Sequence, residues 1–62
     1  MALDPAQISS LSTSLDDLTA RVTALADGYQ GSPREDVAAD LYEVERNLKT
    51  AGRRLRALRQ RL

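Results

Sequence analysis

The 62-residue sequence contains no cysteine, histidine, tryptophan or phenylalanine, and only two tyrosines. Without cysteine the chain forms no disulfide and offers no thiol chemistry. Without histidine it lacks the commonest metal ligand and the usual proton shuttle. A chain this short usually needs a disulfide, a metal or oligomerisation to be stable, and oligomerisation is the one that remains. We therefore expect a homodimer or a larger homo-oligomer.

Motifs that carry catalysis are also missing. The sequence has no glycine-rich phosphate loop. Its carboxylate clusters are Asp16 with Asp17 and Glu43 with Glu45, and adjacent residues of a helix point about 100° apart, so Asp16 and Asp17 do not share a proton. A carboxylate di-metal site in a helical bundle needs Glu and His directed into the core. We predict a protein that is not an enzyme and that uses no cofactor and no metal.

Long apolar runs are absent as well. No segment approaches the ~18 apolar residues of a membrane span. The segment Met1–Pro5 lacks the basic and apolar regions of a signal peptide. The sequence therefore predicts a cytoplasmic protein without a membrane span.

Two runs of apolar residues, spaced by alternating steps of three and four, dominate what is present. The first run is Ile8, Leu11, Leu15, Leu18, Val22 and Leu25, and the second is Val37, Leu41, Val44, Leu48, Ala51, Leu55, Leu58 and Leu62. Such steps average 3.5 residues, the period that keeps one stripe of a helix against a partner helix. The short segment 28–33 between them leaves room only for a reversal. The sequence predicts one all-α domain over residues 1–62, an antiparallel two-helix coiled-coil hairpin.

Capping residues set the expected helix ends. Asp4 can cap a first helix with Pro5 at its first position, and Gly28 is a natural stop. Ser32 and Glu35 form a capping-box pattern around Pro33 for the second helix. Gly52 within that helix indicates either a close backbone approach or a hinge. The expected boundaries are a first helix over about 5–27, a turn over 28–32 and a second helix over about 33–61.

Folding the hairpin about Gln30 places Leu18 opposite Val44 and Leu15 opposite Leu48, and it leaves Leu58 and Leu62 beyond the start of the first helix. One flank of that seam is made of small residues, which would let a second hairpin approach closely. We predict that two hairpins dimerise along this flank into a four-helix bundle. The predicted self-association residues are Ser12, Thr19, Ala26, Ala38, Glu45 and Gly52, with Tyr42 beside them as an anchor or as a half-exposed surface residue.

Charge is distributed unevenly along the chain. Residues 1–50 carry a net charge of −5, and residues 51–62 carry five arginines and no acid, for +5. We call this last segment the basic tip, and its candidate partner-binding residues are Arg53, Arg54, Arg56, Leu58, Arg59, Arg61 and Leu62. The arginines can complement the helix C-terminus and pair with acids of a second subunit. The other candidate ligands are a protein partner, nucleic acid and an anionic membrane surface.

Together these features favour a non-enzymatic protein–protein interaction module, either a small scaffold or a regulatory adaptor. It would self-associate and use the basic tip for a protein partner. The alternative is a small nucleic-acid-associated protein that contacts phosphates through the tip arginines. Overall neutrality disfavours the alternative, because a nucleic-acid-binding domain is usually basic as a whole.

Overall fold

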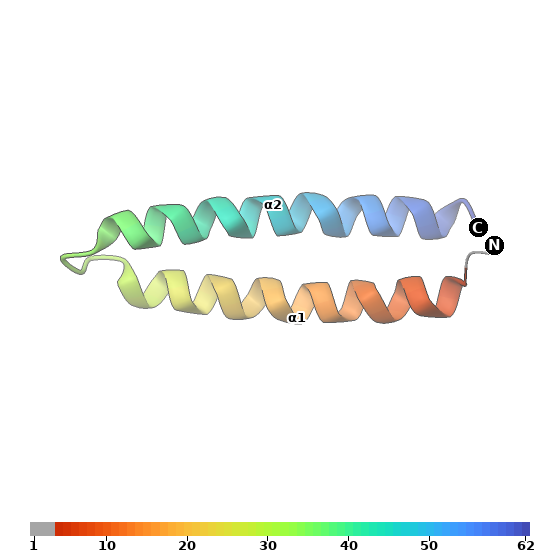
Figure 1. The fold of residues 1–62 in the computed structure, drawn as a ribbon, viewed down its shortest axis with the longest axis horizontal. Coiled ribbons are helices and arrows are strands. Elements are labelled where there is room, and N and C mark those ends of the chain that lie inside the picture. The colour runs from red at the N-terminus through yellow and green to blue at the C-terminus, as the bar shows by residue number, and fades with distance from the viewer. Residues whose placement is uncertain (1–3) are drawn as a thin grey trace.

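The computed structural model describes residues 4–62. It consists of two antiparallel helices, α1 (Pro5–Tyr29) and α2 (Glu35–Gln60), joined by a short connection (Figure 1). The helices form a rod with extents of 49 × 16 × 14 Å. The first turn of α1 and the last turn of α2 lie at the same end of this rod (Figure 1). The all-α antiparallel hairpin expected from the sequence is confirmed.

The N-terminus of α1 is capped as expected. The Asp4 carboxylate accepts a hydrogen bond from the backbone N–H of Ala6, with 2.9 Å between Oδ1 and N, and Pro5 occupies the first helical position. A capping carboxylate satisfies a backbone donor that has no partner within the helix, and it faces the positive end of the helix dipole.

The turn begins later than the sequence suggested. Gly28 is not the stop, because α1 continues to Tyr29 and the Gln30 N–H still donates to the Ala26 carbonyl at 3.1 Å. Gly31 makes the reversal instead, with a φ of 79° in the left-handed region that glycine adopts without strain. The middle of the connection is therefore Ser32 rather than Gln30.

The start of α2 also differs from the expected position at Pro33. The helix begins at Glu35, and the Ser32 hydroxyl accepts a hydrogen bond from the Arg34 N–H at 3.1 Å. Ser32 therefore organises the turn before the helix rather than closing a capping box with Glu35. Glu35 and Asp36 place negative charge at the N-terminal end of α2, where the helix dipole favours it.

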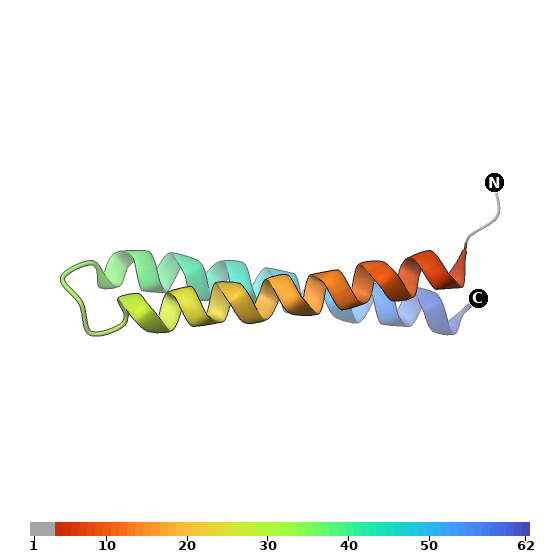
Figure 2. The same cartoon turned by 90° about the horizontal axis from the view of Figure 1, so that it is seen from below.

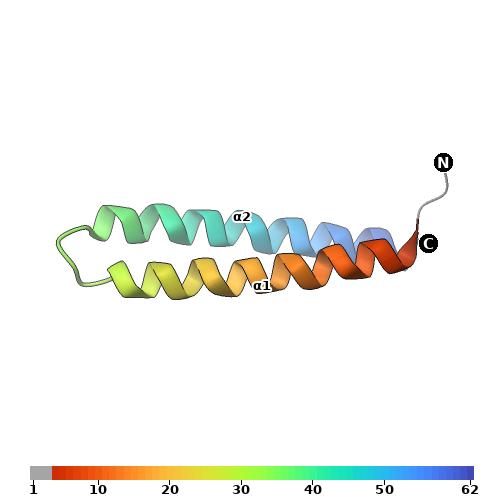
Figure 3. The ribbon, with the colours of Figure 1, turned by 60° about the horizontal axis from the view of Figure 1, so that its bottom comes forward.

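The two helices cross at a shallow angle (Figures 2 and 3). Their register differs from the predicted one. A Cβ atom placed on Gly52 would lie 3.7 Å from Cδ2 of Leu15, and Thr23 is hydrogen-bonded to Glu45. Leu15 thus lies beside Gly52 rather than Leu48, a shift along α2 of roughly one helical turn. Because the reversal is centred later in the chain, α2 does not extend past α1. Leu58, predicted to project beyond α1, is half-buried.

The faces that the helices turn toward each other are also rotated from the prediction. Each helix carries three rows of residues at heptad spacing, which we name rows a, d and e. Row a contains Ile8, Leu15, Val22, Leu41, Leu48 and Leu55; row d contains Leu11, Leu18, Leu25, Val37, Val44, Ala51 and Leu58; row e contains Ser12, Thr19, Ala26, Ala38, Glu45 and Gly52. We predicted a seam of rows a and d. The structure buries rows a and e between the helices and leaves most of row d exposed, so Leu18 and Val44 are 45% and 43% exposed.

Candidate interaction surfaces

The seam between α1 and α2 combines row a, whose aliphatic residues are buried or half-buried, with row e, which is made of small residues and Glu45. Ala26, Ala38 and Gly52 are buried, and Ile8, at 6% exposure, is the one large aliphatic residue with comparable burial in the described chain. Small side chains let two helix backbones approach closely but contribute little apolar area. No large side chain within residues 4–62 is fully buried. The seam therefore fixes the hairpin geometry while leaving its large aliphatic side chains only partly buried, with the exception of Ile8.

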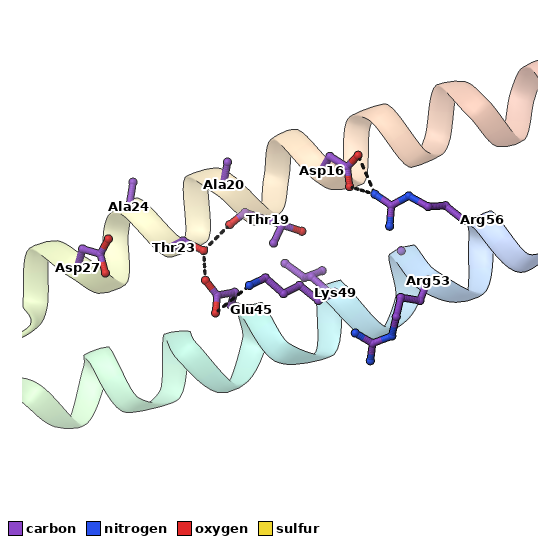
Figure 4. Close-up of a pocket in the computed structure, with 12 residues that line it drawn as sticks. Asp16, Thr19, Ala20, Thr23, Ala24, Asp27, Glu45, Lys49, Arg53 and Arg56 are labelled. Carbon is purple, nitrogen blue, oxygen red and sulfur yellow. Dashed lines mark hydrogen bonds and ion pairs between the residues drawn. The ribbon is translucent and has the colours of Figure 1, made fainter.

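Polar side chains pin the register of this seam (Figure 4). The Thr23 hydroxyl donates to the Glu45 carboxylate, whose side chain is only 17% exposed, and Lys49 Nζ lies 3.8 Å from Glu45 Oε1. Nearer the turn, the Tyr42 hydroxyl donates to the Asp27 carboxylate. This bond raises the pKa of Tyr42, because the bond is lost when the hydroxyl ionises.

The residues predicted to form a self-association flank lie in this seam or at its edge. Ala26, Ala38 and Gly52 are buried within one chain, and Ser12, Thr19, Tyr42 and Glu45 are half-buried. The Ser12 hydroxyl is buried without a hydrogen-bond partner among the described residues. Because these side chains are occupied by the chain's own second helix, a closed hairpin does not offer them to another copy.

A broad apolar surface instead lies on one side of the hairpin. We call it the open apolar face, and it comprises row d together with Tyr29 and Leu62. Its most exposed members are Leu11 at 58%, Leu25 at 54%, Leu62 at 50%, Leu18 at 45% and Val44 at 43%. Monomeric proteins rarely expose a contiguous apolar patch of this kind, which usually marks an interface. The open apolar face is therefore the strongest candidate site of the molecule.

A groove of about 660 Å³ runs along the opposite side of the hairpin (Figure 4). Its α1 wall includes small residues such as Ala20 and Ala24, and charged side chains line it from both helices. At one end the Arg56 guanidinium bridges to Asp16, with Nη2 at 2.8 and 3.0 Å from the two carboxylate oxygens. Both residues are more than half exposed, so this ion pair contributes little stability.

The structure divides the basic tip between different sides of α2. Arg53 and Arg56 line the groove, and Arg56 and Arg59 border a second, smaller hollow. Leu62 belongs to the open apolar face, and Leu58 is half-buried at its edge. The tip residues therefore do not form a single continuous surface.

Four of the five tip arginines have no acidic partner. Arg53, Arg54, Arg59 and Arg61 are exposed, and none forms an ion pair with a described residue. We identified the basic tip from the sequence but did not assign its residues to different sides of the helix, although the helical spacing of the arginines already indicates that distribution.

Neither a metal site nor a membrane-spanning helix is found among the residues that the structure describes. Within residues 4–62, no group of three or more acidic side chains is arranged to hold a metal ion. Neither α1 nor α2 has an apolar stretch long enough to cross a membrane.

Comparison with known proteins gives no match. The sequence fits no protein-family model, and no curated protein or solved structure is significantly similar to it. The functional argument therefore depends on the surfaces described above.

Proposed function

We propose that this protein is a non-enzymatic interaction module in which two hairpins pair through their open apolar faces to form a four-helix bundle. The observation that carries the proposal is the exposure of large aliphatic residues of row d, while rows a and e occupy the seam. A helix of a four-helix bundle contacts two neighbours and needs a stripe wider than rows a and d alone. Row e here faces the helix of the same chain, and row d is free for the second copy.

The surface area of the chain supports the same pairing. A compact monomer of 6.8 kDa has an accessible surface of about 4,000 Å². This chain exposes 4743 Å². The excess, roughly 700 to 800 Å², is close to the ~800 Å² that each partner contributes to a standard-size interface. A second copy laid along the open apolar face covers an area of that order.

The basic tip supplies the second part of the proposal, contact with an acidic protein surface. Arg53 and Arg56 line the groove and Arg59 borders the adjoining hollow, on the side of the hairpin away from the open apolar face. A dimer formed through the open apolar face leaves these three arginines accessible. The module is therefore a scaffold or adaptor with a self-association face and a separate charged face.

A second candidate, phosphate binding to nucleic acid, is favoured by the exposed tip arginines that lack acidic partners. Phosphate contacts weaken steeply between about 50 and 200 mM salt, because bound cations are released from the nucleic acid. An apolar protein contact changes little over that range. Retention of the protein on a nucleic-acid column at both salt concentrations, with the Arg53→Glu/Arg56→Glu variant as comparison, separates the two candidates.

Sedimentation of the intact chain tests self-association. We expect about twice the 6.8 kDa chain mass at micromolar concentration. Leu18→Glu places a charge in the middle of the open apolar face and should abolish the dimer. Ala20→Glu, on the groove side of the same helix, is the matched control and should preserve it. A compact 6.8 kDa wild-type species, or equal loss in both variants, overturns the proposal.

A further inference from the structure

Four charged residues form a strip along the outer edge of the open apolar face on α2. They are Asp36, Glu43, Arg54 and Arg61. The spacings of 7, 11 and 7 residues keep them on one side of a helix, since both intervals are close to whole numbers of turns. All four are exposed, and each directly precedes an apolar residue of rows a or d.

The signs of this strip are antisymmetric about the middle of α2. Reading along the helix they are negative, negative, positive and positive, and the centre lies between Leu48 and Lys49. Reversing the strip end to end therefore exchanges each of these two acids with an arginine, while Asp40, which also precedes a row a residue, meets the neutral Ala57. An antiparallel copy of the same helix is the surface that this pattern complements.

We infer that two hairpins pair antiparallel, with α2 against α2 and α1 against α1, so that Asp36 faces the partner's Arg61 and Glu43 faces the partner's Arg54. This inference rests on the proposed self-association through the open apolar face. The twofold axis relates the two copies at the middle of the rod and repeats each ion pair, which gives four pairs for each dimer.

The register within the hairpin places the same centre on α1. Leu15 lies beside Gly52, and Thr23 is bonded to Glu45, so the level between Leu48 and Lys49 corresponds to about Thr19, next to Leu18. Leu18 is the middle member of the exposed leucines at 11, 18 and 25. A twofold axis at this level stacks Leu18 on the partner's Leu18 and Leu11 on the partner's Leu25. The centres of the apolar and charged patterns of the two helices thus lie within about two residues of one another along the rod.

The parallel arrangement satisfies fewer charges. It places α1 of one copy along α2 of the other at the same height. The corresponding outer edge of α1 carries Gln7, Ser14, Asp17 and Arg21, so Arg21 comes only within about one turn of Glu43 and Asp17 within about one turn of Arg54, while Arg61 faces the neutral Gln7. When each helix is divided at its middle, residues 18–46 carry a net charge of −3 and the remaining halves carry +3. Parallel pairing therefore also stacks like-charged ends.

The ion pairs already present do not prevent this pairing. Asp36 contacts Arg34 at 3.1 Å, and Glu43 contacts Arg46 at 2.7 Å, with all four side chains at least 60% exposed. Exposed pairs of this kind are weak and exchange partners readily. Charge complementarity at the rim selects an orientation, while the apolar face supplies the affinity.

Cysteine cross-linking reads the orientation directly, because the natural chain has no cysteine. Leu11→Cys and Leu25→Cys proteins are mixed, denatured, refolded together and oxidised in a glutathione buffer. Antiparallel pairing predicts a mixed disulfide dimer and little dimer from either variant alone. A mixture of Leu25→Cys and Val44→Cys proteins tests the parallel arrangement, because residues 25 and 44 of different copies approach each other only there.

The outcomes distinguish the antiparallel orientation from self-association itself. Cross-linking of 11 to 25 supports the antiparallel pairing. Cross-linking of 25 to 44 with a dimeric mass overturns the orientation and leaves self-association intact. Failure of both mixtures in a monomeric chain overturns self-association and the orientation with it.

A charge exchange gives an independent readout. Glu43→Arg places like charges opposite each other twice in the dimer and should weaken self-association on the order of tenfold. Glu43→Arg/Arg54→Glu should restore it. The two positions are about 16 Å apart along α2, so rescue must act between copies. Lack of rescue in a folded double variant contradicts the proposed ion pairs.

Discussion

The two apolar regions of this hairpin differ in the kind of residue they contain. The seam between α1 and α2 buries Ala26, Ala38 and Gly52, whereas the open apolar face exposes Leu11, Leu18 and Leu25 along α1. Three large side chains that would gain from burial thus lie outside the contact that defines the fold. The comparison teaches that the seam sets the geometry of the hairpin and leaves a row of large aliphatic residues exposed along one side.

The largest expected effect comes from Leu18→Ala. In a four-helix bundle, each chain buries this side chain, and its truncation should lower the free energy of unfolding by about 2–5 kcal/mol per chain. In an isolated hairpin Leu18 is 45% exposed, and the loss should be far smaller. Urea unfolding at several protein concentrations measures both the loss and the concentration dependence of the midpoint. A small loss with a concentration-independent midpoint contradicts burial of the open apolar face.

Enlarging the seam should have the next largest effect. Ala26 is fully buried, so Ala26→Leu forces the helices apart and should destabilise the hairpin by about 1–3 kcal/mol. Ala24→Leu, on the exposed groove side, serves as the matched control and should change stability little. Circular dichroism during thermal unfolding compares the two variants. Equal melting temperatures would show that the seam is looser than described.

Gly52→Ala should stabilise the protein by up to about 1 kcal/mol, because alanine favours the helical conformation more than glycine does. A Cβ at this position would lie 3.5 Å from Arg56 Nη1 and 3.7 Å from Leu15 Cδ2, which are ordinary contact distances. The seam therefore accommodates the methyl group without moving. A rise in the urea midpoint is expected, and a fall would indicate that the helices approach more closely there.

The smallest effect concerns pH. The Tyr42 hydroxyl donates to Asp27, which raises its pKa above the ordinary value of 10.0. A raised folded-state pKa gives stability that is complete below the unfolded pKa and is lost as the pH rises through the folded pKa. Stability should therefore fall slightly above pH 10, and Tyr42→Phe should remove that part of the decline. Unfolding curves at pH 8 and pH 11 for both proteins measure the difference.

The sequence was sufficient for the elements of this fold but not for their relative rotation. Apolar spacing and the Asp4 cap correctly indicated two helices that reverse direction. We misplaced the seam because rows d and e both adjoin row a, and we assumed that the more hydrophobic residues of row d lie between the helices. The register was misplaced because Gly28 and Gly31 are equally plausible stops in sequence, and only the backbone conformation identifies Gly31 as the left-handed residue.

The candidate surfaces were likewise predicted only in part, because their residues were identified but their positions around the helices were not. The arginines of the tip were identified from composition, but their distribution around α2 depends on the seam rotation. Once row e faces α1, Arg53 and Arg56 fall on the groove side, and Arg54 shares the edge of Asp36. A difference of about half a residue step in rotation therefore places row e, the predicted dimer flank, in the seam and turns row d of the predicted seam outward.

Both aromatic side chains lie near the connection, with Tyr29 at the end of α1 and Tyr42 bonded to Asp27 nearby. No tryptophan or phenylalanine competes with them. Near-ultraviolet spectroscopy of the unmodified chain consequently monitors one extremity of the rod, while far-ultraviolet signals average over its whole length. Heating experiments that follow both wavelengths can time the fraying of that extremity separately, without any introduced probe.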